Sequence, residues 1–123
     1  MGVAVIETKL DGAAGKVLML GSESIGHGDD DLGYEILMAM LASLTKRDDR
    51  PTALIFWNTA VRLLAEGSPA VPHLKTLEGK GVQLLAGQLC VRELELTEKM
   101  AVGRLATMDE ILDLILHNEV VNL

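Results

Sequence analysis

Short apolar runs alternate along the chain with longer segments in which apolar residues recur every three or four positions. The short runs are typical of strands buried on both faces of a parallel sheet. They predict strands over residues 16–22, 52–57, 82–86, 102–106 and 119–123. Gly103 interrupts the fourth run, and a glycine within a strand weakens it.

The segments between these strands have helical periodicity. The longest predicted helix covers residues 31–46, with aspartates at its start and Lys46 and Arg47 at its end, where their charges suit the helix dipole. Shorter helices are expected at 60–65, from Ser68 to about residue 80, within 89–100 and at 108–117. Ser68 followed by Pro69 predicts an N-cap and a first helical position.

This alternation predicts an α/β fold, a three-layer sandwich with a mostly parallel, doubly wound sheet of about five strands. Residues 16–123 form the domain, and residues 1–15 are an N-terminal segment, either an edge strand or an arm that reaches a neighbouring subunit. Ligands of such sheets bind beyond the carboxyl ends of the strands. We therefore expect the loops 21–31, 58–68, 87–90 and 106–108 to meet at one edge.

Composition narrows the class of protein. The length of 123 residues suits one domain. Hydrophobic residues make up 49% of the chain, which is enough for a core. Aromatic residues make up only 2%, so this core must be aliphatic. A net charge of −7 argues against nucleic acid and membrane surfaces as partners. No apolar run reaches the roughly 20 residues that span a bilayer. One cysteine and no basic leader predict a cytoplasmic protein.

The single cysteine, Cys90, is the best candidate for chemistry. It follows the third predicted strand at the start of a predicted helix, and a helix N-terminus stabilises a thiolate. Arg92 adds positive charge nearby, which Glu93 and Glu95 offset. The alternative is that Cys90 is a small buried hydrophobic residue, as free cysteines often are.

The remaining candidates lie in two of the loops. His27 is the one histidine of three on the predicted edge, and a pair with Cys90 would allow hydrolytic or acyl-transfer chemistry. The loop from Gly26 to Asp31 lacks a third glycine and has three carboxylates, which excludes a nucleotide cradle. Helix capping is favoured there over a metal site. Asn58 either caps the next helix, the favoured role, or donates a hydrogen bond into the site.

Four segments carry a family resemblance. They are GHGDDDLG at 26–33, FWNTAVRLLAEGSP at 56–69, LEGKGVQLLAGQLC at 77–90 and VGRLATM at 102–108. In this order they resemble DsrE-like proteins of the DsrE/DsrF-like superfamily, and most of all the C-terminal DsrE-like domain of YedF-type selenium-metabolism proteins. The resemblance covers about residues 16–123.

The resemblance implies a role in sulfur or selenium metabolism, with a persulfide carried on Cys90. It also implies a homo-oligomer, a trimer or a multiple of one, and an external protein that donates or accepts sulfur; no cofactor is expected. Amides around residues 87–89 would stabilise the thiolate. The implied binding residues are Gly21, Ser22, Gly26, His27, Gly28, Asn58, Gly87 and Met108.

Two departures from the family pattern matter. The YedF-type motif is Cys-Gly-Thr-Cys, whereas this chain has Gly87-Gln88-Leu89-Cys90, so Gly87 stands at the first cysteine. Thiol exchange would therefore need an external partner. The family's Asn-Met pair after the fourth strand is here Thr107-Met108. We also expect a stand-alone domain without the companion TusA-like domain, because about 15 residues precede the first strand.

Two rival hypotheses remain beside the sulfur carrier. In the first, the chain is a non-catalytic oligomeric module that binds a ligand or partner at the same edge while Cys90 only packs. The absence of the first cysteine favours it. In the second, Cys90 and His27 perform hydrolytic chemistry.

Overall fold

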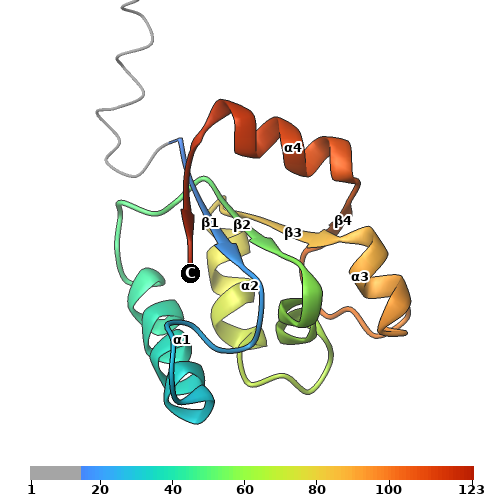
Figure 1. Cartoon of the computed structure of the whole chain (residues 1–123). Coiled ribbons are helices and arrows are strands. Elements are labelled where there is room, and N and C mark those ends of the chain that lie inside the picture. Colours follow the sequence, from blue (N-terminus) through green and yellow to red (C-terminus); the bar gives the residue numbers. More distant parts are fainter. Residues whose placement is uncertain (1–14) are drawn as a thin grey trace, which may run out of the picture.

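Helices and strands alternate along residues 15–123, the part of the chain that the computed structural model describes (Figure 1). The strands are β1 (Lys16–Leu20), β2 (Ala53–Phe56), β3 (Gln83–Gly87), β4 (Arg104–Ala106) and β5 (Glu119–Asn122). The helices are α1 (Asp30–Leu44), the 3-10 helix η2 (Asn58–Leu64), α2 (Val71–Gly79), α3 (Gln88–Glu93) and α4 (Met108–His117). The N-terminal strand or arm expected in residues 1–15 falls almost wholly outside the described residues.

The strands form one five-stranded sheet in the order β4-β3-β2-β1-β5, and all four pairings are parallel. The α/β class and the parallel sheet predicted from the sequence are confirmed. The register pairs Leu20 with Phe56, and Phe56 with Ala86. The carboxyl ends of β1, β2 and β3 therefore lie next to each other.

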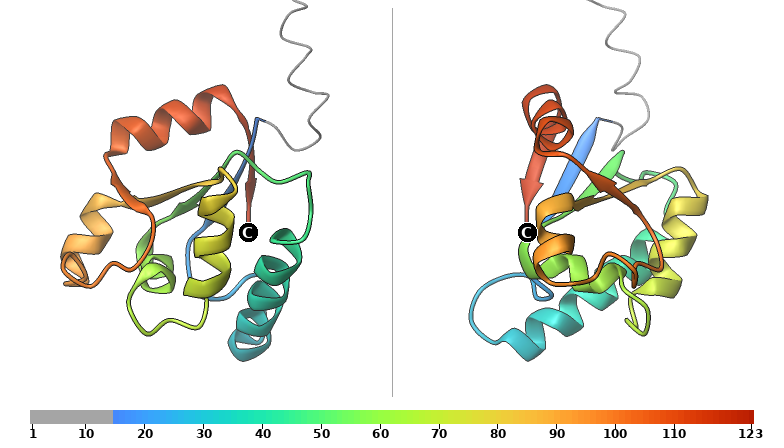
Figure 2. Two further views of the ribbon diagram at one scale, coloured as in Figure 1. Left: turned by 180° about the vertical axis from the view of Figure 1, so that it is seen from behind. Right: turned by 90° about the vertical axis from the view of Figure 1, so that its right-hand side faces the viewer.

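The order of the strands decides which face each helix covers. From β1 to β4 the chain steps across the sheet in one direction, and α1, η2, α2 and α3 lie on one face (Figure 2). The last connection returns from β4 past β3, β2 and β1 to β5, and its helix α4 lies on the opposite face. Reversing direction while keeping right-handed crossovers requires this change of face. The sheet is thus doubly wound, with α4 on its second face.

Two aliphatic clusters, one on each face of the sheet, form the core. The larger lies beneath α1, η2 and α2 and includes Leu20, Phe56, Leu84 and Ala86 among its buried residues. The smaller lies beneath α4, where Ile111 packs with side chains from the other face of the strands. Consecutive residues of β2 alternate between the clusters, which explains why its sequence is continuously apolar.

Helix starts follow local capping chemistry, with one difference from the prediction. The Asp29 carboxylate accepts the Leu32 N–H at 2.9 Å and caps α1 as expected. The second long helix, by contrast, does not begin after Ser68, whose hydroxyl accepts the Ala70 N–H at 3.2 Å within the preceding turn. α2 begins at Val71, and Pro72 occupies its first turn. Proline is tolerated there because those N–H groups have no partner within the helix.

A capping box begins α4. The Thr107 side chain accepts the Glu110 N–H at 3.2 Å, and the Glu110 carboxylate accepts the Thr107 N–H at 3.0 Å. This backbone hydrogen bond, together with Arg104 at 3.0 Å, holds the pKa of Glu110 below its ordinary value of 4.5. The cap fixes the start of α4, which is the helix on the second face of the sheet among the residues that the structure describes.

Close approach of a loop to α1 requires a glycine at position 33. Gly33 is buried, and a Cβ there would meet the hydroxyl of Ser24 and would lie 2.7 Å from the carbonyl oxygen of Ile25. The Ile25 N–H in turn donates to the Gly33 carbonyl at 3.2 Å. The loop after β1 is therefore packed directly against the helix backbone.

We predict that Gly33→Ala lowers the free energy of unfolding by about 1–3 kcal/mol, because the Ile25 backbone must shift to admit the methyl group. Gly79→Ala is the matched control. It also lies in a helix, but a Cβ there would have nothing within 4 Å, so it should be neutral or slightly stabilising. Urea unfolding followed by circular dichroism measures both. Equal stability of the two variants would contradict the close packing.

Candidate functional site

Cys90 lies where β3 passes directly into α3. Gly87 ends the strand and is the N-cap of the helix, which places Cys90 in the first helical turn. The side chain is half-buried and its thiol is free. The short distance between strand and helix leaves the sulfur at the carboxyl edge of the sheet, where parallel α/β folds bind ligands.

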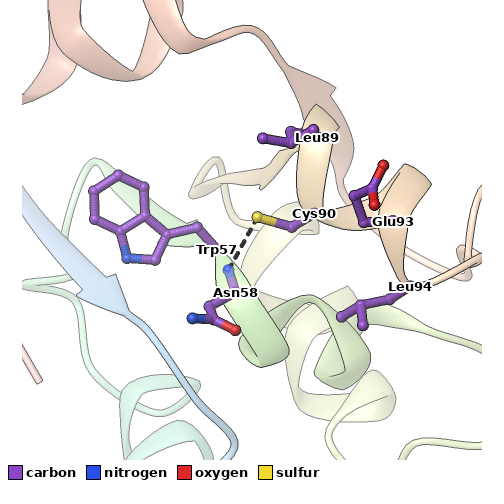
Figure 3. Close-up of a pocket in the computed structure, with 6 residues that line it drawn as sticks. All are labelled: Trp57, Asn58, Leu89, Cys90, Glu93 and Leu94. Atoms are coloured by element: carbon purple, nitrogen blue, oxygen red, sulfur yellow. Dashed lines mark hydrogen bonds between the residues drawn. The ribbon is translucent and has the colours of Figure 1, made fainter.

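The Cys90 sulfur is held by a backbone amide from the neighbouring strand end. The Asn58 N–H donates a hydrogen bond to Cys90 Sγ with an N···S distance of 3.0 Å (Figure 3). Asn58 follows β2 and Trp57, and it adopts a left-handed backbone with a φ of 54°. Asn58 is the first residue of η2 and not its N-cap. The N-cap is Trp57, whose side chain makes no cap hydrogen bond. Of the two roles considered for Asn58, donation into the site is the one that the geometry supports, through the backbone.

Gly87 brings the two strand ends close together around the sulfur. A Cβ at position 87 would lie 3.3 Å from Cys90 Sγ and 3.5 Å from the Cβ of Trp57. Gly87 has a φ of −57°, so its backbone does not require glycine. The absence of a side chain at this position therefore matters for space rather than for conformation.

Two cavities flank the sulfur and share Trp57, Leu89 and Cys90 in their walls. The first, about 400 Å³, extends between α3 and the start of η2 and also contains Asn58, Glu93 and Leu94 (Figure 3). The second, about 290 Å³, extends toward the start of α4 and includes Gly87, Arg92, Thr107 and Met108 among its lining residues. The sulfur is thus accessible from a largely apolar surface that continues on both sides of it.

The two charged residues beside Cys90 lie in different cavities. Glu93 lines the first cavity and Arg92 lines the second. The expected offset of the Arg92 charge by Glu93 is therefore split between two cavities. Among residues 15–123, no group of three or more His, Cys, Asp or Glu side chains is arranged to hold a metal ion. The site therefore consists of a thiol, an amide donor and largely apolar walls, with one charged residue in each cavity.

The loop after β1 contributes less than the sequence suggests. Gly21 lies near the indole of Trp57, since a Cβ at position 21 would be 3.7 Å from Nε1. Ser22 lines a separate acidic cavity with Asp30 and Asp31.

Farther along, this loop turns toward the end of β5. Gly26 and His27 line a cavity with Ile36, Asn122 and Leu123, and Gly28 is exposed. Neither cavity beside Cys90 includes His27. The structure thus brings Asn58, Gly87 and Met108 to Cys90 and places Ser22, Gly26 and His27 in other cavities.

Trp57 and Leu94 line the site but are not candidates in the sequence pattern. The apolar run places Trp57 in the second strand, yet β2 ends one residue earlier and the Trp57 side chain forms a wall of both cavities. The position of Trp57 at the very end of the apolar run is the one feature of the sequence that could have indicated its place in the site. Leu94 follows a six-residue helix, and nothing in the local pattern distinguishes it.

Comparison with known proteins gives a result for structure and none for sequence. No protein-family model matches the chain, and no curated protein does. Several solved structures match it, and three of them have TM-scores of 0.61 to 0.63. The YchN protein of E. coli is 13% identical (TM-score 0.62), and the alignment covers 88% of this chain and 98% of that one.

The other two structures are proteins of unknown function. BT1422 of Bacteroides thetaiotaomicron is 15% identical (TM-score 0.61), covering 89% of this chain and 95% of that one. MTH1491 of Methanobacterium thermoautotrophicum is 14% identical (TM-score 0.63), with 88% and 97% covered. All three belong to the DsrE/YchN-like fold family. The chain has the DsrE/YchN-like fold.

This likeness concerns the fold, which the family resemblance in the sequence had predicted. At 13–15% identity it transfers no activity, so any chemistry has to follow from the Cys90 site itself.

No helix among residues 15–123 is long and apolar enough to cross a bilayer.

We predict that Gly87→Cys forms an intramolecular disulfide with Cys90, because the added Cβ lies 3.3 Å from Sγ on the first turn of the same helix. Mild oxidation should remove two hydrogens from the intact mass and block alkylation of both thiols until a reductant is added. Gly87→Ser, of similar size, is the control and should stay open to alkylation at Cys90. Two freely alkylated thiols in oxidised Gly87→Cys would contradict the geometry.

Proposed function

We propose that this DsrE-like chain is a sulfurtransferase-like protein of sulfur or selenium metabolism that carries a persulfide on Cys90. The observation that carries the proposal is the hydrogen bond from the Asn58 N–H to Cys90 Sγ at 3.0 Å, at a sulfur flanked by two cavities. A donor directed at the sulfur favours its anionic form, which is the nucleophile in sulfur exchange.

The loading step needs a thiolate and a sulfane donor, and no added oxidant. The Cys90 thiolate attacks the outer sulfur of a donor persulfide, RS–SH. A bond forms between Sγ and that outer sulfur, the donor S–S bond breaks, and its electron pair leaves on the donor thiolate. Cys90 then holds Sγ–SH. The selenium counterpart follows the same course with selenium in the transferred position.

Gly87 makes this exchange intermolecular. With glycine at the position of the first cysteine in the YedF-type motif, no neighbouring thiol in residues 15–123 resolves the Cys90 persulfide. Release therefore requires an external acceptor, and loading requires an external donor. The link to YedF-type domains is part of this proposal, as is a cytoplasmic location, which suits a protein with one free thiol.

We further infer a homo-oligomer. Three apolar side chains, spaced four residues apart along α4, are exposed. Their exposed fractions are 56% at Met108, 41% at Leu112 and 73% at Leu116. Leu89, 56% exposed, continues this surface beside Cys90. Burial between copies would remove this apolar area from water.

A non-catalytic binding module is the second candidate. One observation favours it, namely the glycine in place of the first cysteine. In that case the cavities bind a ligand or a partner and the sulfur only contacts it. Hydrolytic chemistry by Cys90 and His27 has no such support, because His27 lines neither cavity beside the sulfur.

The decisive experiment is intact mass after reduced protein is exposed to inorganic polysulfide. We expect a gain of one or more sulfur atoms that dithiothreitol reverses and that Cys90→Ser lacks. The protein contains no other cysteine, so the variant is a complete control. Alkylation of Cys90 without any gain of sulfur would contradict sulfur carriage and favour the binding module.

A further inference from the structure

Asn58 has an unusual backbone at the point where the chain contacts the sulfur. Among residues 15–123, Asn58 and Glu95 are the two residues other than glycine with positive φ, 54° and 59° respectively. Most side chains disfavour this left-handed region, which asparagine and glycine tolerate best. The Asn58 side chain is exposed, so packing does not explain the choice of residue.

Neighbouring contacts fix the chain on both sides of this residue. The Trp57 N–H donates to the Leu20 carbonyl at 3.1 Å, which continues the pairing of β2 with β1. On the other side, the Ala60 N–H donates to the Trp57 carbonyl at 3.2 Å, and Ala60 and Val61 are fully buried. A positive φ at Asn58 lets the chain enter η2 between these contacts while its amide still faces Cys90 Sγ.

We propose that Asn58 is the positioning residue of the sulfur site, and that its left-handed backbone, rather than its side chain, makes Cys90 a good leaving group when sulfur is released. The inference rests on the proposed function and concerns its second step. An acceptor thiolate attacks the outer sulfur of Cys90 Sγ–SH. The new bond forms to that sulfur, whose proton travels with it, and the electron pair of the broken S–S bond goes to Sγ.

The Asn58 amide lies where this charge appears. A fixed N–H donor stabilises an anion more than a neutral group and needs no reorganisation during the reaction. The sulfur that leaves as a thiolate is the one held at 3.0 Å, whereas the outer sulfur is not held by this bond and remains electrophilic. The arrangement thus directs an acceptor to the outer sulfur.

The test compares substitutions that keep or oppose the left-handed backbone. Asn58→Gly keeps it, and Asn58→Val opposes it because a β-branched residue disfavours positive φ. In Asn58→Val the peptide between residues 57 and 58 must rotate, and the N–H turns away from Sγ. Glu95→Val is the matched control, since it introduces the same strain at a residue that lines neither cavity. Asn58→Ala, a milder change, serves if the valine variant does not fold.

Two readouts separate positioning from general destabilisation. The first is the pH profile of iodoacetamide alkylation, which reports the thiolate without any persulfide. The second is the single-turnover reaction of the loaded protein with cyanide, which removes the outer sulfur as thiocyanate and leaves the Cys90 thiolate. We expect Asn58→Val to slow alkylation at neutral pH and to slow cyanolysis roughly tenfold, the effect of losing one hydrogen bond to a charged group.

Glu95→Val should keep the wild-type profile, and Asn58→Gly should lie much closer to the wild type than Asn58→Val does. Identical alkylation profiles and cyanolysis rates in the Gly and Val variants at position 58 would overturn the inference, as would an equal loss in Glu95→Val. If the wild-type protein cannot be loaded with sulfur, the proposed function fails, while the alkylation profiles still decide whether Asn58 positions the amide.

Discussion

The parallel register between β2 and β3 is the constraint on which the sulfur site depends. It pairs Phe56 with Ala86, both fully buried in the larger cluster, so the chain leaves the two strands side by side at the carboxyl edge. The amide of Asn58 and the sulfur of Cys90 meet as a direct result. A slip by one residue would move Phe56 from the larger cluster to the smaller cluster beneath α4 and would disrupt the close packing of both. The core therefore maintains the site.

Much of the fold was predictable because parallel strands buried on both faces require continuous apolar runs, and such runs mark the central strands β1, β2 and β3. The ends of the elements were less predictable, since they depend on backbone conformations such as the φ of 84° at Gly103, which delays β4 to Arg104. The position of Cys90 after β3 also followed from the sequence. The left-handed backbone of Asn58 could not be predicted, because asparagine is common both at helix caps and in left-handed positions. The choice between these two roles depends on the burial of neighbouring residues such as Ala60 and Val61. Likewise, no local signal directs Gly26 and His27 away from Cys90.

The fold and the chemistry rest on different evidence. Structures 13–15% identical share the fold, so the strand order says where a ligand binds and leaves open what is done there. The proposed chemistry needs little beyond the observed groups, because a thiolate exchanges sulfur without a general base. One thiol, one amide donor and apolar walls are sufficient for a carrier that depends on other proteins for loading and release. Gly87 is consistent with this dependence, since it removes the internal alternative.

If the site works as proposed, the Asn58 backbone amide responds to the charge of the Cys90 sulfur. The most direct test follows the Asn58 amide by ¹H–¹⁵N NMR across pH in the wild type and in Cys90→Ala. We predict a large shift of the Asn58 amide proton as the thiol ionises, which is absent in Cys90→Ala, while the Glu95 amide stays unchanged in both proteins. An Asn58 amide that ignores the ionisation of Cys90, or that shifts equally in the variant, would contradict it.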